Sequence, residues 1–290
     1  MVRITIIIPE YGRRELTIKC IRSICETTLD TSRTLHIYIS NDAYPHNLSL
    51  IEIEELQVQY KHTNIEICNW KENVQYAANV NRMSNKILST GVPSGNIFIV
   101  NNDVIFHKDA LNKMTDYLEN HLHKSIVGPA IIIKSNKARP SGHGPNLQMF
   151  VDETYENMKN NFINLPKEPT MLSGCCFGLS IKKWKELGGF DCQRFKAYYE
   201  DDDIGIRAIK AGCKPYILYS AKIEHDFNST YDPTDNKTKA LIAISKANFK
   251  NKWEPDGIIW SPDGFYSQDK ILNLSDLDDR IYYKEAGYIK

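Results

Sequence analysis

Short apolar runs alternate with amphipathic helical patterns through the first 120 residues of the chain. The run Ile4–Ile8 is almost entirely apolar, as in a strand that is buried on both faces. Similar runs predict further strands at Leu35–Ile39, Ile65–Cys68 and Ile97–Val100. Apolar residues at helical spacing lie between them and predict helices over Arg14–Thr27, Leu50–Tyr60, Asn73–Ser89 and Lys108–Asn120. This alternation predicts an α/β fold with a mostly parallel sheet flanked by helices.

The second half of the chain is less regular. Apolar runs predict strands at Ile126–Ile133, Met171–Ile181 and Tyr216–Tyr219. Helical patterns cover Ile204–Ala211 and the basic stretch Lys237–Trp253. The polar segment Lys134–Pro169 is rich in Pro, Gly and Asn, and a loop of that length is usually functional or mobile.

Composition and charge narrow the function classes. The chain has 290 residues, and its 36 basic residues balance 36 acidic ones. Charge therefore does not favour a nucleic-acid partner, although a small basic groove is not excluded. No apolar stretch approaches the roughly 18 residues of a membrane span. The seven cysteines form no C-x-x-C pair, which favours a reducing cytoplasm, with a peripheral membrane location left open.

Polar residues follow two of the predicted strands at the point where each strand ends. Asp42 follows the second strand, and Asn101-Asn102-Asp103 follows the fourth. Amide and carboxylate oxygens suit a hard divalent cation beside a phosphate group, whereas an Asx turn is the simpler reading of an isolated N-N-D. Because parallel strands end at one edge, we expect Asp42 and Asp103 to converge there.

Four consecutive carboxylates, Glu200 to Asp203, stand at the start of a predicted helix. Helix capping accounts for one or two acids, but four repel one another and raise the pKa of at least one, which suits a general base. If the helix begins near Asp202, Asp203 forms a favourable pair with Arg207, and Asp201 lies at the cap. His225 follows a short strand, where a lone histidine is more often structural than a ligand.

The order of these motifs resembles the inverting family-two glycosyltransferases of GT-A (Rossmann-like) fold, with rhamnosyltransferase-like members nearest. The resemblance spans about residues 3–253. It rests on Ile6-Ile7-Ile8-Pro9-Glu10-Tyr11, Ser40-Asn41-Asp42, Asn73 with Gln75-Tyr76-Ala77-Ala78 and Asn81, Asn101-Asn102-Asp103, Ser173-Gly174-Cys175-Cys176, Gly188-Gly189-Phe190-Asp191, Tyr199-Glu200-Asp201-Asp202-Asp203 and His225. It implies a catalytic domain over residues 1–253. Residues 254–290 would then form a docked tail or an acceptor-contacting arm.

The resemblance also implies roles for individual residues. Asp201 would be the catalytic base, and Asp103 with His225 would hold Mn²⁺ or Mg²⁺. Glu200 and Trp253 would lie on the acceptor side. The nucleotide would contact Pro9, Tyr11, Asp42, Gln75, Asn81 and Asn102.

The implied reaction moves a sugar from a nucleotide-diphosphate donor to a hydroxyl acceptor with inversion, as in polysaccharide biosynthesis on a growing glycan. The same chemistry on a modified nucleic-acid base is an alternative. A nucleotidyltransferase would require a Gly-rich phosphate loop, but residues 9–13 contain a single glycine, Gly12. A non-catalytic sugar-nucleotide-binding module would be favoured by loss of the base or the metal aspartate, and both Asp201 and Asp103 are present.

Overall fold

A computed structural model provides the structure of the chain. It describes residues 2–27, 32–45, 49–91, 94–121, 124–133, 137–140, 142–143, 153–154, 171–225, 235–256, 258–261 and 264–267. Most of the predicted loop 134–169 and the end of the C-terminal segment, residues 268–290, lie outside the described residues.

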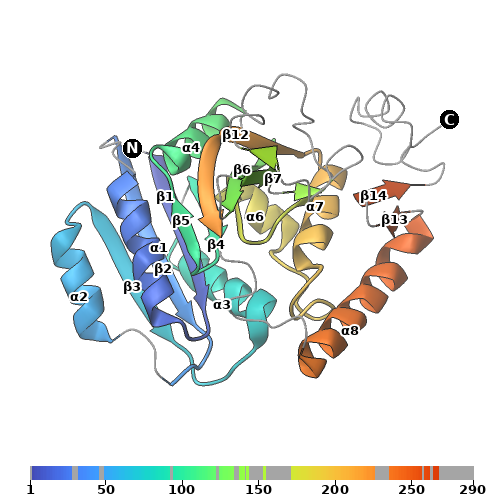
Figure 1. Cartoon of the computed structure of the whole chain (residues 1–290), viewed down its shortest axis with the longest axis horizontal. Coiled ribbons are helices and arrows are strands. Elements are labelled where there is room, and N and C mark those ends of the chain that lie inside the picture. The colour runs from blue at the N-terminus through green and yellow to red at the C-terminus, as the bar shows by residue number, and fades with distance from the viewer. Residues whose placement is uncertain are drawn as a thin grey trace.

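One large sheet forms the centre of the molecule (Figure 1). Its strands are β1 (Val2–Glu10), β2 (Arg33–Asn41), β3 (Thr63–Asn69), β4 (Asn96–Val100), β5 (Val104–Phe106), β6 (Ser125–Ile133), β7 (Lys137–Pro140), β9 (Glu153–Thr154), β11 (Cys176–Ser180) and β12 (Lys214–His225). The order is β3-β2-β1-β4-β11-β6-β12-β5, with β7 beside β6 and β9 beside β7. The first four strands are parallel, as predicted, and β6 pairs in parallel with β12. β11 is antiparallel to both of its neighbours, so the second half of the sheet is mixed.

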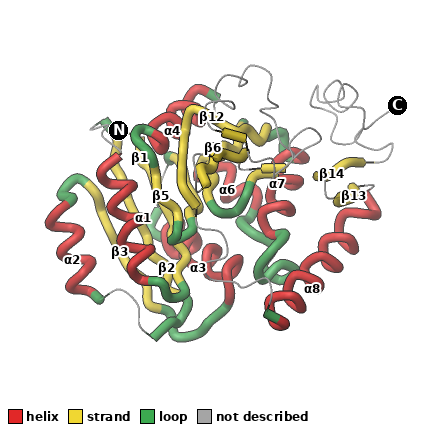
Figure 2. Tube along the Cα trace, viewed as in Figure 1, coloured by secondary structure: helices red, strands yellow, loops and turns green. Residues whose placement is uncertain are grey.

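Helices cover both faces of the sheet (Figure 2). Helices α1 (Arg14–Thr27), α2 (Leu50–Gln59) and α4 (Ala110–Asn120) pack on one face. Helices α3 (Gln75–Ser89), α6 (Ile181–Leu187) and α7 (Glu200–Lys210) pack on the other. In β1, Ile6 and Ile8 join the first core and Ile7 joins the second, because successive side chains of a strand point to opposite faces. The continuous apolar run therefore reflects burial on both sides.

A smaller apolar cluster joins the C-terminal part to the sheet domain. Helix α8 (Asn236–Trp253) contributes Phe249 and Trp253, which pack with Phe195 and Ile206. Ile258 of the hairpin β13 (Ile258–Ser261) and β14 (Gly264–Ser267) joins the same cluster, beyond a short 3₁₀ turn at Glu254–Asp256. Within the described residues, no helix combines the length and the apolar character needed to cross a membrane.

Several predicted elements differ from the structure. The single strand predicted at Met171–Ile181 is two strands, β10 (Met171–Leu172) and β11, separated by a turn at residues 173–175. β10 leaves the large sheet and pairs with β8 (Gly142–His143). The sequence analysis did not predict β5 or α6, which have three and seven residues and so show little periodicity. β12 is longer than predicted and has an irregularity between Leu218 and Lys222, where its pattern changes.

Candidate active site

Asp103 and His225 lie together at the carboxyl edge of the sheet. Asp103 follows β4, and His225 is the last residue of β12, where it pairs with Val104 of β5. This register places His225 Nε2 3.2 Å from Asp103 Oδ1, and less than a tenth of either side chain is exposed. The short strand β5, which was not predicted, is thus the element that brings the two together.

Cys175 is the third residue of this group, and the sequence analysis did not single it out as a site residue. Its backbone carbonyl accepts a hydrogen bond from the Asn101 N–H at 2.8 Å. Burial lowers the pKa of His225, but interactions with Cys175 and Asp103 outweigh burial and raise that pKa to about 10. The imidazole therefore lies among groups that favour positive charge, as a cation site does.

Asp201 contacts the turn between β10 and β11 (residues 173–175), which also contains Cys175. Its Oδ2 accepts the Gly174 N–H at 2.7 Å, and its Oδ1 accepts the Asp202 N–H at 3.0 Å. Burial raises the pKa of Asp201, while these two N–H donors act to lower it. A carboxyl with a raised pKa is better matched to accepting a proton near neutral pH than an exposed aspartate.

The predicted helix start near Asp202 was wrong. Helix α7 begins at Glu200, so Asp201 lies in the first turn rather than at the cap. The preceding residues, Tyr198 and Tyr199, have φ values of 66° and 68°, which non-glycine residues rarely adopt. This left-handed pair turns the chain sharply into α7 and directs Asp201 toward Gly174 instead of the helix end.

Burial, more than the predicted repulsion between neighbouring acids, raises the pKa values of the carboxyl groups at the start of α7. For Glu200 and Asp202, burial is the main reason that the pKa rises well above its usual value, and the charge of Asp201 adds to it. Glu200 is nearly inaccessible, and its Oε2 has no hydrogen-bond partner among the residues that the structure describes. The helix therefore buries acids that favour the protonated form.

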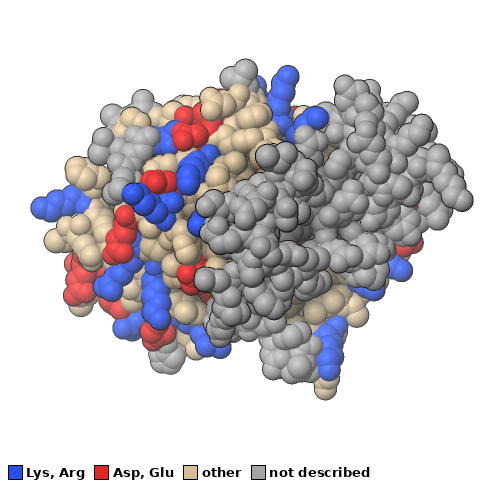
Figure 3. Space-filling view, turned by 45° about the horizontal axis from the view of Figure 1, so that its top comes forward, with Lys and Arg blue, Asp and Glu red and all other residues tan. Residues whose placement is uncertain are grey.

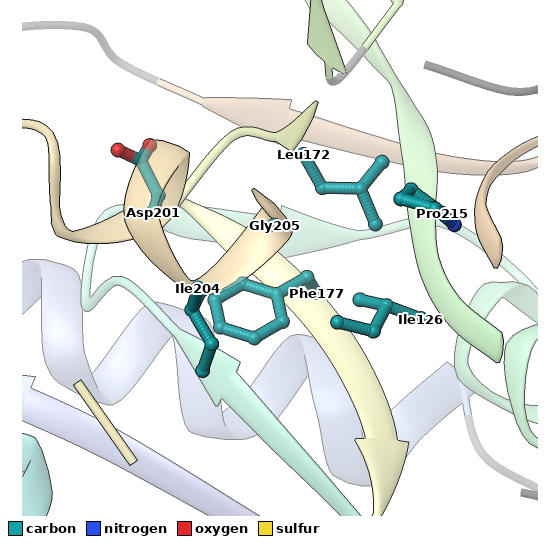
Figure 4. Close-up of a pocket in the computed structure, with 7 residues that line it drawn as sticks. All are labelled: Ile126, Leu172, Phe177, Asp201, Ile204, Gly205 and Pro215. Atoms are coloured by element: carbon teal, nitrogen blue, oxygen red, sulfur yellow. The ribbon is translucent and has the colours of Figure 1, made fainter. Parts of the chain in front are cut away.

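A small cavity lies beneath Asp201 (Figure 4). The cavity measures about 10 Å³, the size of a single-water site, and apolar side chains from β6, β10, β11 and α7 line most of it. Figure 4 shows the Asp201 carboxylate at its edge, turned away from Phe177 and Ile126. The apolar lining accounts for the burial of Asp201 on that side.

The pairing predicted between Asp203 and Arg207 is confirmed, and it is part of a larger network. Asp203 is fully buried and accepts Arg207 Nε at 2.7 Å. Lys252 Nζ lies 2.6 Å from its Oδ1, and Trp253 Nε1 donates to the same oxygen at 3.0 Å. Trp253, predicted on the acceptor side, thus binds α7 with its indole N–H, and Lys252 was not predicted at all.

Two of the residues predicted around the nucleotide, Asp42 and Gln75, meet at the end of β2, two strand spacings (about 10 Å) from β4. Asp42 accepts the N–H groups of Val74 and Gln75 at 2.9 and 2.8 Å, and it pairs with Arg82 at 2.5 Å. Arg82 was missed because its partner is 40 residues away in the sequence. Asp42 and Asp103 thus lie at the same edge of the sheet, as predicted. Among the described residues, no hydrogen bond joins them directly.

Two other predicted nucleotide residues lie beside this group. Gln75 has φ of 68°, and within the described part of the chain its buried Oε1 has no hydrogen-bond partner. Tyr11 is about half exposed, and its ring packs edge-to-face on Tyr44 with centroids 5.2 Å apart. A half-exposed aromatic ring of this kind is suited to contact with a planar ligand.

Three predicted nucleotide residues make internal contacts. Pro9 is buried in β1. Asn81 exchanges hydrogen bonds with the backbone N–H and carbonyl of Phe190, at 2.9 and 2.7 Å. Asn102 Nδ2 donates to the Gly12 carbonyl and to Thr17 Oγ1. These side chains shape the loops of the edge, and contact with a nucleotide stays a prediction for them.

The Asp103–His225 pair was tested as a site for a divalent metal. Oxygen and imidazole donors 3.2 Å apart on the carboxyl edge suit Mn²⁺ or Mg²⁺. In the part of the chain that the structure describes, no group of three or more His, Cys, Asp or Glu is arranged to hold a metal ion. An ion held by this pair would have to take its remaining ligands from a bound phosphate and water.

Comparisons with known proteins agree with this architecture. Two solved structures share the fold: GalNAc-T7 with UDP, GalNAc and Mn²⁺, at a TM-score of 0.64 and 10% identity, and S. aureus TarS, at a TM-score of 0.52 and 12% identity. The alignments cover 99% and 84% of this chain, which spans 57% and 39% of those two chains. No curated protein sequence gives a significant match. A family model described as glycosyl transferase family 2 matches residues 5–188. The chain, with its GT-A-like α/β fold, therefore belongs to glycosyl transferase family 2.

Proposed function

We propose that the protein transfers a sugar from a nucleotide-diphosphate donor to a hydroxyl acceptor, with inversion at the anomeric carbon. The observation that carries the proposal is a single turn, residues 173–175. It contacts the candidate base Asp201 on one side and the Asp103–His225 pair on the other. A base and a cation site held this close suit a displacement in which one group gains a proton while the other stabilises a leaving phosphate.

Donor binding would use the carboxyl edge from β2 to β4. The nucleobase of the donor would stack on the half-exposed ring of Tyr11, and Asp42 and Gln75 would contact the polar edge of the nucleobase. The diphosphate would extend toward Asp103 and His225, the residues that would hold Mn²⁺ or Mg²⁺. A metal bound there would neutralise the charge that develops on the departing diphosphate.

Asp201 would act on the acceptor. As the acceptor hydroxyl oxygen bonds to the anomeric carbon, its proton moves to a carboxylate oxygen of Asp201. The bond from that carbon to the diphosphate oxygen breaks, and its electron pair leaves with the nucleoside diphosphate. A single displacement of this kind inverts the anomeric configuration. Each carboxylate oxygen of Asp201 accepts one backbone N–H, Oδ2 from Gly174 and Oδ1 from Asp202, and each keeps a second lone pair that could accept the proton.

A growing glycan is the proposed acceptor. In the view of Figure 3, Lys and Arg are interspersed with Asp and Glu over the described part of the surface, rather than forming a field of one sign. A mixed surface of this kind gives no electrostatic support for a nucleic-acid acceptor.

Donor binding is the first test. Purified protein is screened with UDP-, GDP- and dTDP-sugars, each with and without Mn²⁺, while the melting temperature is recorded. Donor at 100 times its dissociation constant stabilises by about 2.7 kcal/mol, which corresponds to a rise of about 5–11 °C for a chain of this size. A protein that none of these sugars stabilises, with or without Mn²⁺, would contradict donor binding.

The base is tested with Asp201→Asn, which keeps the size and one acceptor oxygen. We expect the variant to bind the selected donor normally and to transfer about 100- to 10,000-fold more slowly. Asp202→Asn is the matched control, since Asp202 is buried in the same helical turn and its raised pKa favours the neutral form. If Asp201→Asn retains more than about a tenth of wild-type transfer, the base is another group.

A further inference from the structure

Tyr76 reaches from the start of α3 to the turn between β10 and β11. Its hydroxyl donates to the Gly174 carbonyl at 2.8 Å, across 98 positions of sequence. Burial and the nearby acids Glu200 and Asp201 raise the pKa of Tyr76 well above its usual value, so the hydroxyl keeps its proton and stays a donor. The Tyr76 ring packs against Phe190, with centroids 6.0 Å apart, which limits its movement.

Gly174 is the point where this contact meets the candidate base. Its N–H donates to Asp201 Oδ2 at 2.7 Å while its carbonyl accepts from Tyr76. A Cβ added at Gly174 would lie 3.2 Å from Asp201 Oδ2 and 3.3 Å from Asp201 Cβ. The close approach of Asp201 to the backbone therefore depends on glycine at this position.

The other side of the turn is also fixed. The carbonyl of Cys175, the next residue, accepts the Asn101 N–H at 2.8 Å, and Cys175 interacts with His225. The turn thus has one anchor on α3, one on the loop after β4 and one on α7. The distance between Asp201 and the Asp103–His225 pair is set by how firmly this turn is held.

We infer that Tyr76 is a positioning residue for Asp201, acting through the backbone of Gly174. The inference rests on the proposed function, in which Asp201 is the base. Without the Tyr76 hydroxyl, the Gly174 carbonyl loses the donor that fixes it, and the N–H that holds Asp201 is free to shift. In the described hydrogen bonds the Tyr76 hydroxyl contacts Gly174 and none of the residues proposed to bind the donor, so we expect its loss to affect the chemical step more than donor binding.

The experiment compares Tyr76→Phe with Tyr38→Phe. Tyr38 lies in the middle of β2 and its hydroxyl accepts a hydrogen bond from Arg3 at 2.7 Å, so the control removes the same group away from the site. The assay follows release of nucleoside diphosphate from the UDP-, GDP- or dTDP-sugar that the Mn²⁺ screen selects, with water and free monosaccharides as acceptors. We expect Tyr76→Phe to lower kcat about 10- to 100-fold with an unchanged KM for the donor.

The pH dependence gives an independent readout. A weaker Gly174–Asp201 hydrogen bond stabilises the carboxylate less, so the acid limb of the kcat profile should move to higher pH in Tyr76→Phe. Tyr38→Phe should leave both kcat and the profile unchanged. Equal losses of melting temperature in the two variants, with wild-type kcat and profile in Tyr76→Phe, would show a purely structural role and overturn the inference.

Gly174→Ala decides the matter if Tyr76→Phe does not fold. The added methyl would press on Asp201 from the same turn, so the same fall in kcat at constant KM is expected. A normal kcat in Gly174→Ala would overturn the inference. Asp201→Asn separates the two hypotheses: if it transfers normally, the proposed function fails, and if only Tyr76→Phe and Gly174→Ala transfer normally, the positioning role alone fails.

Discussion

Replacing Asp203 with Asn tests whether the buried network at the start of α7 holds α8 in place. Asp203 is fully buried and is contacted by Arg207, Lys252 and Trp253. The substitution is isosteric, so it removes one negative charge without opening a cavity. Arg207 and Lys252, each with about a fifth of its side chain exposed, would then face a neutral amide.

The expected loss of unfolding free energy depends on which hydrogen-bond partners Arg207 and Lys252 retain in the variant. Breaking a buried ion pair by removing one partner costs about 3–5 kcal/mol. Lys252 retains Asp191 at 2.8 Å, and Arg207 retains two backbone carbonyls, so neither cation is left without a partner. We therefore expect the lower end of the range, about 3 kcal/mol. For a chain of this size that corresponds to a melting temperature about 6–12 °C lower.

The assay is urea unfolding at pH 7, with the melting temperature from circular dichroism as a second measure. Asp191→Asn is the matched control, because it removes a carboxylate from the same Lys252 where more water has access. The control should cost less than about 1 kcal/mol. If Asp203→Asn destabilises the protein no more than Asp191→Asn does, burial of the pair is not what anchors α8 and the reasoning is refuted.

Two further outcomes are expected. Burial raises the pKa of Glu10 to about 7, opposed by its hydrogen bond from Thr17, so the folded protein holds a proton that the unfolded chain releases. Stability should therefore fall as the pH rises from about 4.5 to 7, by up to about 3 kcal/mol, and Glu10→Gln should remove that loss; equal differences in unfolding free energy between pH 5 and pH 8 for the two proteins would contradict this. His225→Ala should weaken Mn²⁺ binding in the presence of UDP, measured by calorimetry, far more than it lowers the melting temperature. Unchanged Mn²⁺ affinity with a large thermal loss would favour a structural histidine.

Local patterns were sufficient for the first half of the fold. The helix predicted over Arg14–Thr27 has the same limits in the structure. Its apolar stripe runs without interruption along the segment, so the local pattern alone defines it. The run Ile4–Ile8 marked a central strand for a similar reason, since both faces of β1 are covered. Short elements such as β5 contain too few residues to show a period, so they could not be predicted.

The site was predictable where its chemistry lies in a contiguous motif. The pair Asp203–Arg207 followed from helical spacing alone. The contact between Asp103 and His225 depends on the register of β12 against β5, and no local pattern specifies that register. Tyr76 and Lys252 were missed because each acts on a partner at least 49 positions away in the sequence. Long-range partners of this kind require the sheet order to be known first.

The pairing of β11 with β4 has a consequence for how the protein folds. Strands β1, β2 and β3 pair with their neighbours in the chain. In contrast, β4 meets β1 through partners such as Asn96 and Ile4, separated by 92 residues, and β11 meets β4 through partners such as Cys176 and Val100, separated by 76 residues. Closing a loop of that length costs about 4 kcal/mol of chain entropy before its contacts form. The end of β2, where we propose that the nucleotide binds, can thus form early, while the turn that holds Asp201 forms only after this closure. Catalytic competence is therefore expected to appear as a later kinetic phase than donor binding during refolding.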